Sequence, residues 1–216
     1  IGLPVFVNKL KAAGFRQVAR DERKLGLSVV LGGGGVTLEE LTGLFVAYAN
    51  QGRYAPISYL PGAAAVPTPL VSPAAAFVVT EMLTQATRPD LPNNYQSSPH
   101  LPRIAWKTGT SYGRRDAWSI GYNKKYTVGI WVGNFSGAGV SELSGAEIAT
   151  PLLFKVFNSI DYDSDEEWFT QPKDCEIRMV CPETGVPPGE HCPGLVSDYF
   201  IPMVSVSIPC NNMEEM

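Results

Sequence analysis

The sequence lacks an apolar run near the roughly 18 residues that a membrane-spanning helix needs, and it lacks an excess of positive charge. Its formal net charge of −4 at pH 7 argues against a nucleic-acid backbone as a partner. It shows no signal peptide, but it begins with Ile1 rather than Met. We therefore expect a piece of a longer protein, in which case the absence of a targeting segment says nothing about where that protein acts.

Several catalytic signatures are also missing from the 216 residues. No serine has a lysine three positions later, and S-x-N does not occur. The related pattern Y-x-N, at Tyr48 to Asn50, falls inside a predicted helix and is interpreted as packing and a helix end. The two histidines, His100 and His191, have no serine partner and are interpreted as surface residues. The glycines at residues 32–35 lack the Lys-Ser/Thr of a P-loop and predict a turn.

The composition is that of a globular protein, with 44% hydrophobic and 18% charged residues. The length allows one sizeable domain with an appendage. An acidic run at residues 161–167 is interpreted as a solvated linker. It divides the chain into a main part, residues 1–160, and a Pro-rich and Cys-containing extension, residues 161–216.

All four cysteines, Cys175, Cys181, Cys192 and Cys210, lie in this extension. An even number of clustered cysteines favours disulfides and an oxidising compartment, with three pairings open. Zinc is less favoured, because the spacing C-x5-C-x10-C-x17-C contains no C-x-x-C. Free thiols are the third alternative. We predict no metal site and no organic cofactor.

Helix signals appear at four places in the main part. Pro4 predicts a helix start and Gly14 its end. Thr37 followed by Glu40 predicts a capping box. Ser72 before Pro73 predicts another start. Residues 145–160 predict a last helix, whose buried face is expected to hold Ile148, Leu152, Phe154 and Phe157.

Three strand-like runs lie between these helices, at residues 103–110, 117–122 and 126–132. The short turn at residues 123–125 predicts an antiparallel hairpin of the last two strands. Helices followed by adjacent antiparallel strands and a helix predict an α+β fold.

The first of these strands, residues 103–110, contains the candidate functional residues. It ends in Lys107, Thr108, Gly109, Thr110 and Ser111. An edge strand pairs with an extended peptide, and Gly109 leaves room for its backbone. The lysine attracts an anionic group, and a threonine hydroxyl orients a carboxylate. By itself, however, Lys-Thr-Gly-Thr is a short pattern that also occurs by chance.

The surroundings make the pattern specific. Residues 106–118 read WKTGTSYGRRDAW, residues 126–134 read YTVGIWVGN, and VTLEEL at residues 36–41 precedes AYAN. These segments resemble, in order and spacing, the transpeptidase domain of class A penicillin-binding proteins, and the Cys-rich tail resembles the family's C-terminal extension. The resemblance implies part of a penicillin-binding transpeptidase and β-lactamase-like fold, with an antiparallel sheet flanked by helices.

The resemblance also implies roles. Lys107 polarises a serine of the S-x-N motif and attracts the substrate's carboxylate, and Thr108 and Thr110 bind that carboxylate. The Thr110 N–H supplies one oxyanion donor, while Gly109 and Ser111 complete the substrate-binding edge. The nucleophile of S-x-x-K is expected upstream of this chain, so that the chain alone is inactive.

Four neighbouring residues are assigned structural roles. Arg115 and Asp116 are expected to form a local ion pair, and Trp118 and Trp131 are expected to be core or groove wall.

The resemblance implies a parent that cross-links peptidoglycan stem peptides, reacts with β-lactams, and carries a glycosyltransferase domain. That parent is expected to be anchored in the membrane and exposed on its extracytoplasmic side. Two alternatives remain: a β-lactamase-like hydrolase, and a non-catalytic cell-wall binding module on a degenerate transpeptidase fold.

Overall fold

The computed structural model describes residues 1–63, 65–84, 88, 103–162, 167–190 and 192–210. In chain order, its elements are α1 (Leu3–Ala12), α2 (Arg16–Asp21), η1 (Glu22–Lys24), η2 (Leu27–Leu31), α3 (Leu38–Ala49), β1 (Arg53–Tyr54), β2 (Thr68–Pro69), α4 (Pro73–Thr84), β3 (Ala105–Thr110), β4 (Asp116–Tyr122), β5 (Thr127–Gly133), η4 (Gly145–Ala149), α5 (Thr150–Ile160), β6 (Glu176–Val180) and β7 (Val196–Phe200). The fold is mixed α+β with antiparallel sheets, as predicted.

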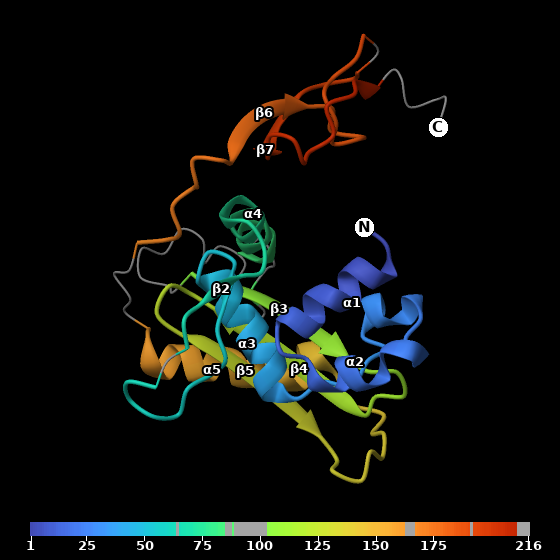
Figure 1. Cartoon of the computed structure of the whole chain (residues 1–216), viewed down its shortest axis with the longest axis vertical. Coiled ribbons are helices and arrows are strands. Elements are labelled where there is room, and N and C mark those ends of the chain that lie inside the picture. Colours follow the sequence, from blue (N-terminus) through green and yellow to red (C-terminus); the bar gives the residue numbers. More distant parts are fainter. Residues whose placement is uncertain (64, 85–87, 89–102, 163–166, 191, 211–216) are drawn as a thin grey trace.

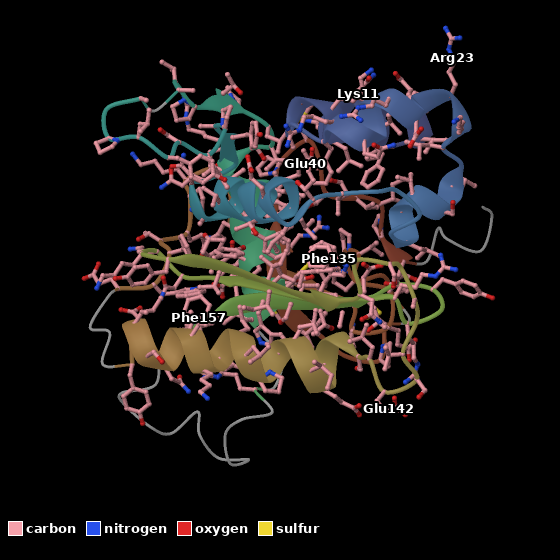
Figure 2. The ribbon with its side chains drawn as sticks, turned by 90° about the horizontal axis from the view of Figure 1, so that it is seen from below. Lys11, Arg23, Glu40, Phe135, Glu142 and Phe157 are labelled. Atoms are coloured by element: carbon pink, nitrogen blue, oxygen red, sulfur yellow. The ribbon has the colours of Figure 1, made fainter. Side chains whose placement is uncertain are left out.

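The centre of the molecule is the antiparallel sheet β3-β4-β5 (Figure 1). Its register pairs Thr110 with Ala117 and Trp118 with Trp131, which confirms the three predicted strands and the hairpin. Figure 2 shows α5 on one face of this sheet, on the side of Phe157, and α3 on the other, on the side of Glu40. Both faces are therefore covered along much of their length.

The helix starts follow their local signals. The Thr37 hydroxyl accepts the Glu40 N–H, and the Glu40 carboxylate accepts the Thr37 N–H, each near 3 Å, so the capping box is confirmed. The Ser72 hydroxyl caps α4 by accepting the Ala75 N–H at 3.2 Å. Gly14 adopts a φ of +82° just after α1, a conformation that glycine reaches without strain.

The helix after β5 begins with a π-helical turn, η4, which continues into α5. A π turn inserts one extra residue and rotates the helix face. Leu153, Phe154 and Phe157 are fully buried against the sheet, whereas Ile148 and Leu152 are 38% and 44% exposed. The expectation that the latter two are buried was wrong, because the buried face is formed by Leu153, Phe154 and Phe157, and Ile148 and Leu152, four residues apart, lie on another side of the helix.

The turn between β4 and β5 is hydrogen-bonded to Asp161, the first residue of the acidic run at residues 161–167. The Asn123 side-chain oxygen accepts the N–H groups of Lys125 and Tyr126, and its amide donates to Asp161 at 2.6 Å. Asp161 is buried and also lies 3.5 Å from the Lys125 ammonium. Asp161 is therefore part of the packed domain and not of a solvated linker, while residues 163–166 lie outside the described residues.

The C-terminal extension packs on α4 through Phe169, Cys175 and Tyr199. The Phe77 and Tyr199 rings meet edge to face at 5.4 Å. Glu81 accepts the Trp168 indole N–H at 2.7 Å and pairs with Arg103 at 3.1 Å. Within the described part of the chain, no helix is long and apolar enough to span a membrane.

A backbone contact fixes the end of β3 against η4. The Gly145 N–H donates to the Thr110 hydroxyl at 2.9 Å. A Cβ at Gly145 would lie 2.3 Å from the Gly109 carbonyl oxygen and 2.7 Å from that of Trp118. The two backbones approach this closely because position 145 has no side chain.

We predict that Gly145→Ala lowers the free energy of unfolding by about 1–3 kcal/mol, because the added methyl forces η4 away from the strands. Gly26→Ala is the matched control, since a Cβ there meets no atom within 4 Å and the backbone φ is −111°. Urea unfolding of both variants measures the difference. Equal stability of the two variants would contradict the close approach.

We also predict that the capping carboxylate makes stability pH-dependent. Burial raises the pKa of Glu40, but hydrogen bonds from the Thr37 and Arg16 N–H groups and pairing with the Arg16 guanidinium lower it overall. A depressed pKa stabilises the fold above the pKa of an unfolded glutamate, about 4.3, and this contribution is lost as the pH falls through the folded value.

The stability difference between the wild type and Glu40→Gln should therefore be largest at neutral pH and shrink in acid. Urea unfolding at a series of pH values measures it. Glu147→Gln is the control, because Glu147 is exposed and has no hydrogen-bond partner among the described residues. A difference that does not change with pH would contradict the assignment.

Candidate functional site

Strand β3 is an edge strand of the central sheet. In the described part of the chain it pairs only with β4. The Ser111 N–H donates to the Asp116 carbonyl at 3.0 Å, one step beyond the pair Thr110–Ala117. Hydrogen-bonded and non-bonded pairs alternate along an antiparallel ladder, so the backbone N–H and C=O groups of Thr108 and Thr110 point toward the free edge. An extended peptide can add to this edge as a further strand.

Lys107 and Gly109 lie on the face of the sheet that α3 covers in part. The Lys107 side chain is exposed, and its ammonium donates to the Thr108 carbonyl at 2.9 Å. Among the described residues it has no carboxylate partner. The strand thus presents an uncompensated positive charge beside its free edge, where an anionic group would be attracted.

Thr108 and Thr110 lie on the opposite face, toward α5. Thr108 is half-buried, and its hydroxyl has no protein partner in the described part of the chain. Thr110 is exposed, and its oxygen accepts the Gly145 N–H. A hydroxyl that accepts from an N–H keeps its own proton to donate, so both threonines have an O–H available for an acceptor.

Ser111 forms the turn between β3 and β4. Its hydroxyl accepts the N–H groups of Arg115 at 3.2 Å and Asp116 at 2.9 Å. This contact shapes the turn and still leaves the Ser111 proton free to donate. The substrate-binding role of Ser111 stays a prediction.

The predicted ion pair between Arg115 and Asp116 was wrong. Asp116 instead accepts the Trp131 indole N–H at 2.9 Å across the two strands, and the described residues show no ion pair for Arg115. The Trp118 and Trp131 rings lie 6.3 Å apart, and Phe135, labelled in Figure 2, continues the row 5.7 Å from Trp131. This aromatic row lies on the same face as Gly109, whose Cβ position is 3.6 Å from the Trp118 Cβ.

The structure thus places the predicted residues Lys107, Thr108, Gly109, Thr110 and Ser111 along one accessible edge. It does not add a nucleophile to them, since no serine of the chain has the S-x-x-K context. Asn50 ends α3 and donates to the Arg53 carbonyl at 3.4 Å, in agreement with its structural interpretation.

Sequence reasoning missed Gly145, which holds the Thr110 hydroxyl. The signal available in the sequence was only a glycine before an apolar helix, which is too common to interpret.

Comparisons with known proteins agree with the sequence patterns. The chain is 36% identical to penicillin-binding protein 1C of Escherichia coli over 153 residues, 71% of this chain and 20% of that protein. It is 29% identical to penicillin-binding protein 2D of Bacillus subtilis over 134 residues, 59% of this chain and 19% of that protein. The chain therefore spans about a fifth of the length of these relatives. No family model matches it.

Among solved structures, penicillin-binding protein 1A of Haemophilus influenzae matches the fold with a TM-score of 0.73. The match covers 96% of this chain and 38% of that one, at 16% identity. The form Ser-Tyr-Gly-x-Arg-Asp-Ala-Trp at residues 111–118 indicates a likeness to penicillin-binding protein 1C, and the comparison confirms it. The chain is a partial homologue of the class A penicillin-binding proteins.

Proposed function

We propose that this chain supplies the C-terminal part of a D,D-transpeptidase domain, a serine acyltransferase that cross-links peptidoglycan stem peptides and is acylated by β-lactams. The observation that supports the proposal is the edge of β3 that pairs with no other described strand. This edge combines the exposed Lys107 ammonium, which has no carboxylate partner among the described residues, with the outward backbone groups of Thr108 and Thr110. The homology to penicillin-binding proteins supports this assignment.

In the proposed mechanism, a stem peptide lies along β3 as an added strand. Lys107 attracts its terminal carboxylate, and the hydroxyls of Thr108 and Thr110 donate hydrogen bonds to it. The outward N–H of Thr110 donates to the carbonyl oxygen as that atom becomes negative, which contributes about 3–4 kcal/mol to the transition state by analogy with other oxyanion donors.

The serine nucleophile is proposed to lie in the parent protein, outside these 216 residues. It would attack the carbonyl between the two terminal D-alanines, release D-alanine, and pass the acyl group to an amine acceptor. The parent is proposed to act on the extracytoplasmic side of the membrane, where peptidoglycan is assembled.

We predict that Lys107→Ala in the intact parent slows acylation by a fluorescent penicillin by 100-fold or more, on the order of the loss seen when a transition-state donor is removed. Lys124→Ala is the matched control, since Lys124 is exposed in the turn between β4 and β5. The rate of covalent labelling, resolved after denaturation, measures the effect. Undiminished labelling of Lys107→Ala would show that Lys107 has no role in the reaction.

The 216-residue chain alone should not be labelled covalently, because it contains no S-x-x-K serine. Labelling of this chain that survives denaturation would overturn the assignment of the nucleophile to the parent.

Because this chain contains no S-x-x-K, a second function remains open for the parent, that of a non-catalytic cell-wall binding module. If the parent carries no such serine, it would bind peptidoglycan peptides reversibly and resist acylation, so the same labelling experiment on the parent distinguishes the two functions.

A further inference from the structure

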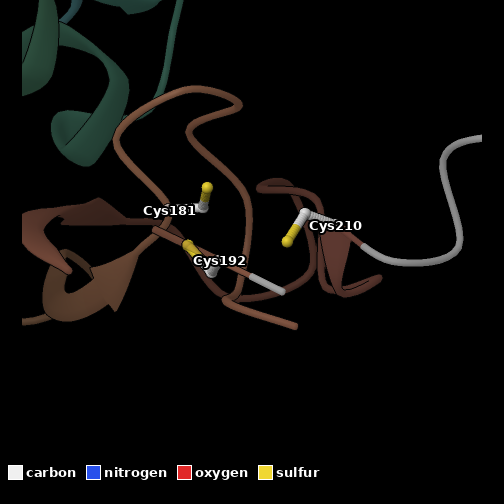
Figure 3. Close-up of side chains that lie close together, drawn as sticks. All are labelled: Cys181, Cys192 and Cys210. Carbon is white, nitrogen blue, oxygen red and sulfur yellow. The ribbon is translucent and has the colours of Figure 1, made fainter. Parts of the chain in front are cut away.

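The C-terminal extension brings three of its four cysteines together. The sulfur atoms of Cys181, Cys192 and Cys210 all lie within 4.8 Å of one another (Figure 3). Cys175 is buried elsewhere, in the apolar cluster that joins the extension to Phe77 of α4. The four cysteines therefore do not lie as two pairs, which is the arrangement that two disulfides require.

The backbone around the three cysteines is held by turns that lie close to one another. The Cys181 N–H donates to the Val186 carbonyl at 2.9 Å, and the Cys192 N–H donates to the Gly189 carbonyl at 3.3 Å. The N–H of Cys210 donates to the Pro187 carbonyl at 3.1 Å. Residues from three separate stretches of chain thus converge because residues 186–189 connect them.

Backbone N–H groups are directed at two of the sulfurs. The Gly189 N–H donates to the Cys210 sulfur at 3.1 Å, and the N–H groups of Glu183 and Thr184 donate to that of Cys181. Such donors stabilise thiolates, and they commonly surround the sulfur ligands of metal ions.

The extension also has little hydrophobic core to stabilise it. Beyond Cys175, its buried apolar side chains are Val180, Cys181 and Val186. Ile177 and Met179 of β6 are largely exposed, and the sheet has only two strands. A two-stranded hairpin is marginal in water, and modules of this size normally need a disulfide or a metal ion.

We propose that Cys181, Cys192 and Cys210 bind a structural Zn²⁺ ion as three thiolates. Zinc–sulfur bonds of about 2.3 Å in a tetrahedron place sulfurs roughly 3.8 Å apart, within the spacing that the three side chains already have. Soft thiolates select zinc over magnesium or calcium. Binding displaces the thiol protons to solvent, and water takes the fourth position.

This proposal replaces the disulfides favoured by the sequence. A disulfide between any two of the three cysteines would leave the third thiol in contact with it, whereas one zinc ion uses all three. The proposal is independent of the proposed transpeptidase function, because it concerns only the extension.

The test is native mass spectrometry of the 216-residue chain, purified in reducing buffer containing zinc. We expect one zinc ion per chain, and its loss when Cys181, Cys192 or Cys210 is changed to Ala. Cys175→Ala is the matched control and should keep the metal. A wild-type chain without zinc, or one that loses zinc equally in the control, would overturn the site.

Two further measurements need no substitution, so they test the site even if the cysteine variants fail to fold. Replacing zinc with Co²⁺ should give the intense sulfur-to-cobalt charge-transfer absorption of a thiolate site, and its absence would exclude the three thiolates. Peptide mapping of the parent, extracted without reductant, should show no disulfide among the three cysteines. A disulfide joining any two of them would refute the zinc site.

Discussion

The position of the candidate site depends on the contact between Gly145 and the ends of β3 and β4. Since no side chain intervenes, the Gly145 backbone lies directly against the Gly109 and Trp118 carbonyls, and its N–H holds the Thr110 hydroxyl. The contact anchors one face of β3 to the helix that follows the hairpin. It leaves the outer edge of the strand free, so the groups that face this edge are positioned by packing and remain accessible. A rigid strand with an open edge suits peptide recognition, and the exposed Lys107 charge protects that edge from pairing with other sheets.

The C-terminal extension depends on two different kinds of contact. One part packs on α4, where Glu81 accepts the Trp168 indole and Phe77 meets Tyr199. The part around Cys181, Cys192 and Cys210 has few buried apolar groups and is organised around these three cysteines. The part on α4 therefore follows the stability of the main domain, whereas the part around the three cysteines requires a cross-link of its own. Under the zinc proposal, metal removal would loosen the turns around the three cysteines and leave the strand that carries Lys107 in place.

Much of the fold could be predicted from the sequence because it rests on interactions between near neighbours. The capping box of Thr37 and Glu40 joins residues three apart, and Ser72 caps the helix that starts immediately after it. The alternation of residues 126–132 and the short turn before them specify the hairpin. The motif that begins at Lys107 lies on one strand, so its residues were certain to be adjacent once the strand was recognised. These features need no knowledge of the rest of the chain.

Other features were decided only by tertiary structure, because they join residues that are distant in sequence or respond to packing. Ile148 and Leu152 face solvent because Leu153 and Phe157 lie on the side of the helix that packs on the sheet. Asp116 paired with Trp131 of the neighbouring strand instead of with Arg115 beside it. The cysteine spacings alone allowed pairs, metal ligands or free thiols. Only the folded turns of the extension show that three sulfurs converge and that Cys175 does not, since loop closure brings together positions that no sequence period relates.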